Sequence, residues 1–340
     1  MYINMEKWAS DIIECADIKA LPILYFPCVP LVNKGVIEVV HNSKSHFEVM
    51  KVVIEKFPNM IGAMTGMDLT TEAETFGCEV KFKDTEAPST LGGIVDNQAS
   101  VESFIVPSIE SGRAPLFTEA TAMATDYFTD RPVFGGVLGP YSLAAILMEL
   151  TKSFKALRKD PETLHTLLDK CTEYIISYAM AFKEAGANGI LLAEPTAGLL
   201  SPAQCEEFSS KYVKKLIDAV QDKGFFVILH NCGSVIPMVE SMVGTGAKGY
   251  SFGNAVNMVD VINKVPDHFL VFGNIDPSKM MIEKNPEVIY SETKSLLEKM
   301  KPFKNFVLST GCDLPLETPI ANIDAFFKAL ADFNKENANQ

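Results

Sequence analysis

The sequence predicts an α/β fold, a TIM (β/α)8 barrel with an N-terminal helical extension and a small inserted hairpin. Short apolar runs repeat along the chain and are separated by amphipathic stretches. Such runs are typical of strands buried on both faces, and their alternation with helices predicts parallel strands joined by right-handed crossovers. No glycine-rich phosphate loop, the mark of many doubly wound open sheets, occurs in the chain, which favours a closed barrel.

The first part of the chain is expected to supply the extension, two strands and the hairpin. Residues 1–20 form the predicted extension, and residues 21–26 (LPILYF) and 61–69 (IGAMTGMDL) the first two strands. Residues 79–95 alternate in polarity and contain two adjacent glycines. This pattern predicts a hairpin inserted into the barrel.

The remaining strands and their helices alternate regularly along the chain. Six strands are expected at residues 133–138, 189–194, 225–230, 249–253, 269–274 and 306–311. Helices are predicted over residues 162–186, from the capping pair Ser201-Pro202 onward, and over residues 319–330. The polar segment 334–340 is expected to be a frayed tail. No linker divides the chain, so we predict one domain spanning all 340 residues.

Composition excludes several kinds of partner. The net charge is −13, and only three residues are arginine. Nucleic acids and anionic membranes require clustered positive charge, so neither is expected as a partner. The seven cysteines are widely spaced and odd in number, which does not indicate a disulfide framework. The start of the chain resembles no signal peptide, and we expect a cytoplasmic protein with reduced thiols.

Functional groups in a parallel barrel lie at the carboxyl ends of the strands, and three candidate metal ligands fall there. His230 and Cys232 are two residues apart at the end of the fifth strand, so their side chains point to the same side. Cys312 follows the eighth strand at the equivalent height. One imidazole and two thiolates suit zinc with an open coordination position. The alternative for each residue alone is burial as an ordinary core side chain.

Five polar residues at other strand ends are candidate substrate-binding groups. They are Asp68, Glu194, Asn254, Asn274 and Asp276. Each side chain could orient a ligand or the substrate. Each could equally cap a helix or close a turn, and Asp276 stands directly before a proline, as at a helix start.

The same residues resemble a known family. The chain is similar to the uroporphyrinogen decarboxylase superfamily and, within it, to the zinc-dependent methylcobalamin:coenzyme M and related corrinoid:thiol methyltransferases. The similarity rests on residues 135–145 (GGVLGPYSLAA), 185–216 and 273–277 (GNIDP), and on His230-x-Cys232 with the distal Cys312.

The resemblance implies a function, a cofactor and a partner. His230, Cys232 and Cys312 would hold Zn²⁺. A methyl group would pass from a methylated corrinoid, methylcobalamin or a corrinoid carrier protein, to a thiol such as coenzyme M or homocysteine. Relatives in the wider group commonly have a glutamate ligand near the sixth strand, but residues 251–254 (SFGN) contain no acid. The fourth zinc ligand is therefore not assigned: water, Asp276 and another nearby group are the alternatives.

Two alternatives stay open at this point. A uroporphyrinogen decarboxylase would resemble this chain in fold, but that branch carries an arginine-rich N-terminal motif, and residues 1–96 contain no arginine. A non-catalytic barrel that binds a corrinoid or a carrier protein is the other alternative. A measurement of bound zinc distinguishes the two, because the enzyme is expected to contain zinc and the binding protein is not.

Overall fold

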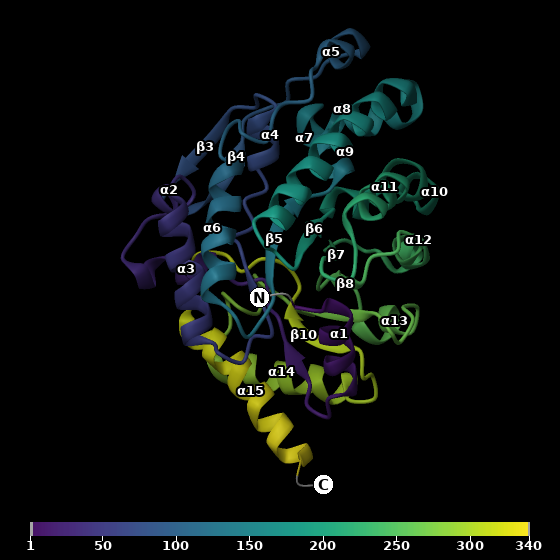
Figure 1. The fold of residues 1–340 in the computed structure, drawn as a ribbon. Coiled ribbons are helices and arrows are strands. Elements are labelled where there is room, and N and C mark those ends of the chain that lie inside the picture. The colour runs from purple at the N-terminus through teal and green to yellow at the C-terminus, as the bar shows by residue number, and fades with distance from the viewer. Residues whose placement is uncertain (1–2, 339–340) are drawn as a thin grey trace.

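Eight parallel strands form the centre of the protein. The computed structural model describes residues 3–338, and Figure 1 shows helices packed around these strands. The strands are β1 (Lys19–Ala20), β2 (Ala63–Met64), β5 (Val133–Leu138), β6 (Gly189–Ala193), β7 (Phe226–Asn231), β8 (Gly249–Phe252), β9 (Leu270–Ile275) and β10 (Phe306–Thr310). They are ordered β1-β10-β9-β8-β7-β6-β5-β2, so each strand lies beside its neighbours in the chain.

The sheet closes on itself between its first and last strands. A parallel bridge joins Ala20 to Met60, and the Ile61 N–H donates to the Ala20 carbonyl over 3.1 Å. All other pairings in the sheet are also parallel. The predicted TIM barrel is therefore confirmed.

Burial explains why the strands read as continuous apolar runs. Every residue of β6, β7, β8 and β10 is buried, because the barrel interior covers one face and the helices cover the other. Alternation in polarity cannot appear in a strand with no face toward water.

Helices cover the outside of the barrel. The longer ones are α3 (Ser43–Lys56), α6 (Ala114–Tyr127), α7 (Pro140–Leu147), α8 (Leu150–Lys159), α9 (Pro161–Glu184), α11 (Lys211–Val220), α14 (Pro286–Met300) and α15 (Ile320–Ala338). The shorter segments are α2 (Val36–Val39), α4 (Thr71–Thr75), α5 (Gln98–Ser103), α10 (Pro202–Cys205), α12 (Val239–Gly244), α13 (Met258–Ile262), the 3₁₀ turns η1 (Phe26–Val32), η2 (Pro195–Leu199) and η4 (Ile236–Met238), and the π turn η3 (Glu206–Ser210). Within residues 3–338 no helix has both the length and the apolar character needed to cross a membrane.

Local signals placed two helices as predicted. Helix α9 ends just before Gly186, whose φ of +90° favours glycine. Helix α10 begins after Ser201, whose hydroxyl accepts from the Gln204 N–H. The Gln204 side chain in turn accepts from the Ser201 N–H. This reciprocal capping box is what the Ser-Pro start indicated.

The N-terminal extension covers the amino-terminal end of the barrel. Helix α1 (Met5–Glu14) is tied to the loop before β7, because the Met5 N–H donates to the Lys223 carbonyl over 2.9 Å. The Trp8 indole N–H donates to the Ile61 carbonyl over 3.3 Å, and its ring packs against Phe134. The site described below therefore lies at the opposite, carboxyl end.

The predicted hairpin consists of β3 (Val80–Lys83) and β4 (Glu86–Thr90), which pair antiparallel. Its strands begin and end within the expected segment 79–95. Lys83 and Glu86 face each other across the turn, and their charged atoms are 2.6 Å apart.

The first two strands are shorter than predicted. Residues 21–26 are not a strand: β1 precedes them, and η1 begins at Phe26. Pro22 lacks an N–H, so it cannot extend the ladder that Leu21 still makes with the Leu308 carbonyl. The second strand ends before Gly66, whose N–H donates to the His46 imidazole instead of to a strand.

The expected frayed tail at residues 334–340 is wrong for the part that the structure describes. Helix α15 continues to Ala338, and residues 339–340 lie outside the described residues. The Asn334 side chain accepts from the Ile18 N–H over 3.1 Å and donates to the Ile18 carbonyl over 2.9 Å. This pair of hydrogen bonds fastens the last helix to the start of the barrel.

Candidate metal centre

A cavity of about 370 Å³ opens at the carboxyl end of the barrel. Its wall is mostly apolar and comes from the ends of β6 and β7, from the segments that follow β1, β2 and β10, and from the hairpin. Hairpin residues Glu86, Ala87 and Pro88 form one side, so the insertion is part of the site. A small molecule bound here would be largely shielded from water.

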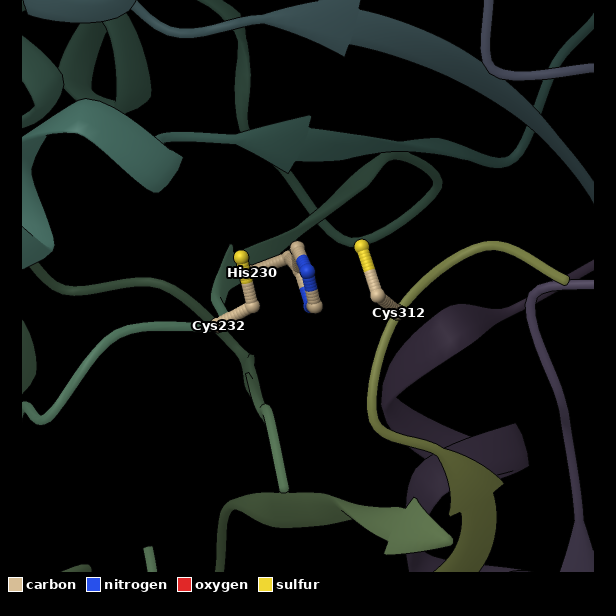
Figure 2. A group of neighbouring side chains, drawn as sticks. All are labelled: His230, Cys232 and Cys312. Carbon is tan, nitrogen blue, oxygen red and sulfur yellow. The ribbon is translucent and has the colours of Figure 1, made fainter. Parts of the chain in front are cut away.

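His230, Cys232 and Cys312 lie together on the wall of this cavity. Their ligand atoms are all within 4.8 Å of one another. Figure 2 shows the three side chains converging, the first two from the end of β7 and the third from the loop after β10. Strand pairing brings the ends of β7 and β10 to the same mouth although 80 residues separate the two cysteines in the sequence.

The His230 ring is oriented by one neighbour and has one nitrogen left over. Its Nδ1 lies 2.9 Å from the hydroxyl oxygen of Ser251 on β8. Its Nε2 is buried and has no hydrogen-bond partner among the described residues, and the residue is 2% exposed. A buried nitrogen without a partner is costly, so this geometry is suited to a ligand that Nε2 can bind.

The two thiols influence each other strongly. The hydrogen bond with Cys312 and the neighbouring His230 lower the pKa of Cys232, and the same hydrogen bond together with burial raises the pKa of Cys312. One thiol of the pair therefore loses its proton well before the other.

The three residues fit a zinc ion. One nitrogen and two sulfur donors are the ligand types that zinc prefers over magnesium or calcium. The donors are close enough for one ion, they are half-buried or buried, and the unpartnered Nε2 is among them. Three protein ligands leave a fourth position for a substrate.

Backbone packing keeps this ligand set compact. A Cβ atom added to Gly311 would lie 2.6 Å from the Asn254 backbone nitrogen, and one added to Gly253 would lie 2.4 Å from the Cys232 Cα. Only glycine at these two positions allows the loop after β8 to approach both the loop after β10 and Cys232 this closely.

Asp276 and Asn254 lie at the mouth but hold each other. The Asn254 amide donates to one carboxylate oxygen of Asp276 over 2.8 Å. The other oxygen accepts from the Ser278 and Lys279 N–H groups over 2.9 and 2.8 Å. Asp276 is not in the metal-ligand group, and its hydrogen bonds are those of the turn alternative. Its predicted role in substrate binding stays a prediction.

Asn274 acts on the loop rather than on a substrate. Its side-chain amide donates to the carbonyls of Gly253 and Val256 over 2.9 and 2.8 Å. These bonds hold the loop after β8 against Cys232. Asn274 therefore positions this loop, and its predicted contact with substrate stays a prediction.

Glu194 faces away from the cavity and caps a helix. Its two carboxylate oxygens each accept from one backbone N–H at the start of α7, that of Tyr141 and that of Ser142, both over 2.8 Å. Burial raises the pKa of Glu194. A carboxylate is stabilised by the N-terminus of a helix, so these contacts are those of the capping alternative, and a substrate contact of Glu194 stays a prediction.

Asp68 is also turned away from the cavity. Its neighbours Met67 and Leu69 line the wall, while Asp68 forms a buried ion pair with Arg113 and accepts from the Thr70 hydroxyl. Asp68 is not among the residues that line the cavity, and its predicted substrate contact stays a prediction.

Sequence reasoning missed Asp313, which does line the cavity. Its Oδ1 is buried and has no partner among the described residues, and burial raises its pKa. Its position directly after Cys312 at a strand end was the available signal.

The architecture and the ligand set together define a class of protein, a (β/α)8 barrel with a histidine–dicysteine group at its mouth. The profile of the uroporphyrinogen decarboxylase (URO-D) family matches residues 31–333, and the chain belongs to this family.

Two relatives and one solved structure are similar to this chain over most of its length. The chain is 30% identical over 270 residues to the methylcobamide:CoM methyltransferase MtbA of Methanosarcina acetivorans, covering 78% of both chains. It is 26% identical over 311 residues to a uroporphyrinogen decarboxylase of Vibrio campbellii, covering 86% of this chain and 84% of the other. A solved methyltransferase from Methanosarcina mazei has the same fold, with a TM-score of 0.85, 24% identity and coverage of 98% and 99%.

Proposed function

We propose that this protein is a zinc-dependent methyltransferase that moves a methyl group from a methylated corrinoid to a thiol. The observation that carries this proposal is the convergence of His230, Cys232 and Cys312 on the cavity wall, with Nε2 of the histidine buried and unpartnered. The similarity to MtbA, named a methylcobamide:CoM methyltransferase, supports the same reaction class.

The residues of the chain have separate parts in this reaction. A zinc ion held by the three ligands would lower the pKa of the acceptor thiol, so that a nucleophile is available at neutral pH. Ser251 orients the histidine, and Asn274 holds the loop that lies against Cys232. The apolar wall, including Met67 and Leu314, excludes water and so strengthens electrostatic interactions at the sulfur.

The proposed transfer is a single displacement at carbon. The acceptor sulfur forms a bond to the methyl carbon while the cobalt–carbon bond breaks heterolytically. The electron pair of that bond stays on cobalt, which changes from Co(III) to Co(I), and the thiol proton passes to solvent. The donor is methylcobalamin or a methylated corrinoid carrier protein, and the acceptor is a thiol such as coenzyme M or homocysteine.

The decarboxylase alternative has the similarity to the Vibrio enzyme in its favour. The cavity argues against it, because none of the described residues that line it is lysine or arginine. A substrate with several carboxylates requires such cations.

The decisive experiment measures zinc content and reaction together. We expect purified protein to contain about one zinc per chain and to demethylate free methylcobalamin when a thiol is added, which is followed by the change in the cobalamin spectrum. Protein that neither retains nor responds to zinc, or that is inactive with every thiol, would refute the proposal. Metal-independent turnover of a porphyrinogen would instead support the decarboxylase.

A further inference from the structure

A second cavity, the base cavity, has a volume of about 610 Å³ and lies at the amino-terminal end of the barrel. Helix α1 forms one side of it, and the other side comes from the first residue of β7 and from the segments directly before β8, β9 and β10. Figure 1 shows α1 beside β10. The base cavity shares no lining residue with the cavity of the candidate metal centre, so a ligand bound here would leave the barrel mouth free.

Three phenylalanine rings, those of Phe226, Phe269 and Phe303, form the apolar part of the wall. Phe269 and Phe303 are only half-buried, because no other element of the described chain covers the side of each ring that faces the cavity. The segments that carry these two rings are fixed. The Asn305 amide donates to the Phe269 carbonyl over 2.9 Å, and the Phe306 N–H donates to the Phe303 carbonyl over 3.2 Å. A preformed aromatic wall of this kind suits a ligand with a flat ring.

Two lysines bring positive charge to the same wall. Lys248 and Lys304 line the base cavity, and neither has an ion-pair partner within residues 3–338. The Lys248 ammonium lies 5.7 Å from the centre of the Phe269 ring, so this cation is directly beside the aromatic surface. A ligand that covers the rings therefore has two ammonium groups within reach of its edge.

The acids of the wall do not neutralise these lysines. The Glu6 carboxylate pairs with the Lys223 ammonium at 3.9 Å. The Asp267 side chain is fully exposed at the rim, where its carboxylate lies 3.8 Å from Nδ1 of His268. The unpaired charge at the base cavity is therefore positive, although the chain as a whole has a net charge of −13.

We propose that the base cavity binds a small aromatic anion, whose ring packs on the phenylalanine wall while Lys248 and Lys304 hold its carboxylate, sulfonate or phosphate group. Lysine is a compact charge on a flexible stem, so the two ammonium groups can follow an anionic group attached to rings of different size. This binding site is separate from methyl transfer, and the inference does not rest on the proposed function.

Two dyes with the same ring system provide the test. 1-Anilinonaphthalene-8-sulfonate carries one negative charge, and 1-anilinonaphthalene lacks the sulfonate and is neutral. Fluorescence titration of the full-length protein measures the affinity for each dye. The double variant Lys248→Gln/Lys304→Gln should bind the sulfonate dye about tenfold more weakly than the wild-type protein, and the neutral dye less than about twofold more weakly.

The matched control is the double variant Lys44→Gln/Lys155→Gln. It removes the same charge from exposed positions on the outer helices α3 and α8, which do not line the base cavity, and it should leave both affinities unchanged. An equal loss of sulfonate-dye affinity in both double variants would show that only the net charge matters, and the proposal would be wrong. An unchanged affinity in the Lys248→Gln/Lys304→Gln variant would refute it as well.

A third variant locates the dye. Ser10 lies on α1, is exposed and lines the base cavity, so Ser10→Trp should fill the cavity from its rim without disturbing the core. We expect it to weaken binding of the sulfonate dye at least about tenfold, whereas Ser291→Trp on α14 should not. Full affinity in Ser10→Trp would place the dye at the barrel mouth or on another surface. That result, or the absence of any dye binding to the wild-type protein, would overturn the proposal and leave the methyltransferase function untouched.

Discussion

Ser251 and His230 are direct neighbours across the β7–β8 pair, and the Ser251 hydroxyl oxygen lies 2.9 Å from Nδ1 of the histidine. The two residues are 21 positions apart in the sequence, and only the strand register brings them together. This hydrogen bond sets the direction of the ring and leaves Nε2 facing the thiols.

The first prediction tests that orienting bond. We expect Ser251→Ala to fold normally but to bind zinc about ten- to hundredfold more weakly, because a group that hydrogen-bonds to a metal-ligating histidine contributes this much to affinity. Competition with a chromophoric chelator measures the affinity. Ser291→Ala, an exposed serine on α14, is the control, and equal zinc affinity in both variants would contradict an orienting role.

The second prediction concerns the thiols. Cys232→Ala and Cys312→Ala should each lower the zinc content from about one ion per chain to near zero, because two remaining ligands do not form a closed site. Metal analysis after gel filtration measures the content. Cys15→Ala, which changes a half-buried thiol at the end of α1, should retain zinc. Retention of full zinc content by either ligand variant would show that the metal is held elsewhere.

The third prediction separates a cap from a substrate contact. Glu194→Gln should lower the free energy of unfolding by about 1–3 kcal/mol, because the amide NH₂ faces a backbone N–H that previously donated to a carboxylate oxygen. Zinc content and KM for the thiol should be unchanged. Urea unfolding measures the loss, with the exposed Glu119→Gln as control. A raised KM without a loss of stability would restore Glu194 as a binding residue.

The fourth prediction is a pH dependence of stability at Glu72. One carboxylate oxygen accepts from the Leu138 N–H over 2.7 Å, the other is buried without a partner, and burial raises the pKa of Glu72 to about 7. The folded state therefore favours the protonated carboxyl group of Glu72. The stability that this preference contributes is lost as the pH rises through 7.

The variant Glu72→Gln keeps the acceptor for Leu138 and cannot ionise. Between pH 5 and pH 8 the wild-type protein should lose about 2–3 kcal/mol of unfolding free energy relative to this variant. His46 has the opposite effect on the pH dependence of stability, because burial lowers its pKa to about 4. This effect is the same in both proteins and therefore cancels in the comparison. Parallel stability curves for the two proteins would contradict the assignment.

The sequence by itself determined the barrel and predicted the candidate metal-ligand group. Apolar runs locate strands because a strand buried on both faces is mostly apolar, and His230 and Cys232 share a side because side chains alternate along an extended chain. The apolar runs and the His230-x-Cys232 pair depend on residues that are close together in the chain, whereas Cys312 joins them through the regular order of the strands. The first strand was misplaced for an equally local reason, since a single proline stops its ladder.

Only the tertiary structure decided which partners the polar residues at the strand ends have. Glu194 and Asp68 stand at strand ends, as functional residues do, yet their partners Tyr141 and Arg113 are 53 and 45 positions away in the sequence. Asp313, next to a ligand, is left without a partner at the cavity wall. The partner of a polar side chain is set by contacts between distant segments, and local periodicity does not contain that information.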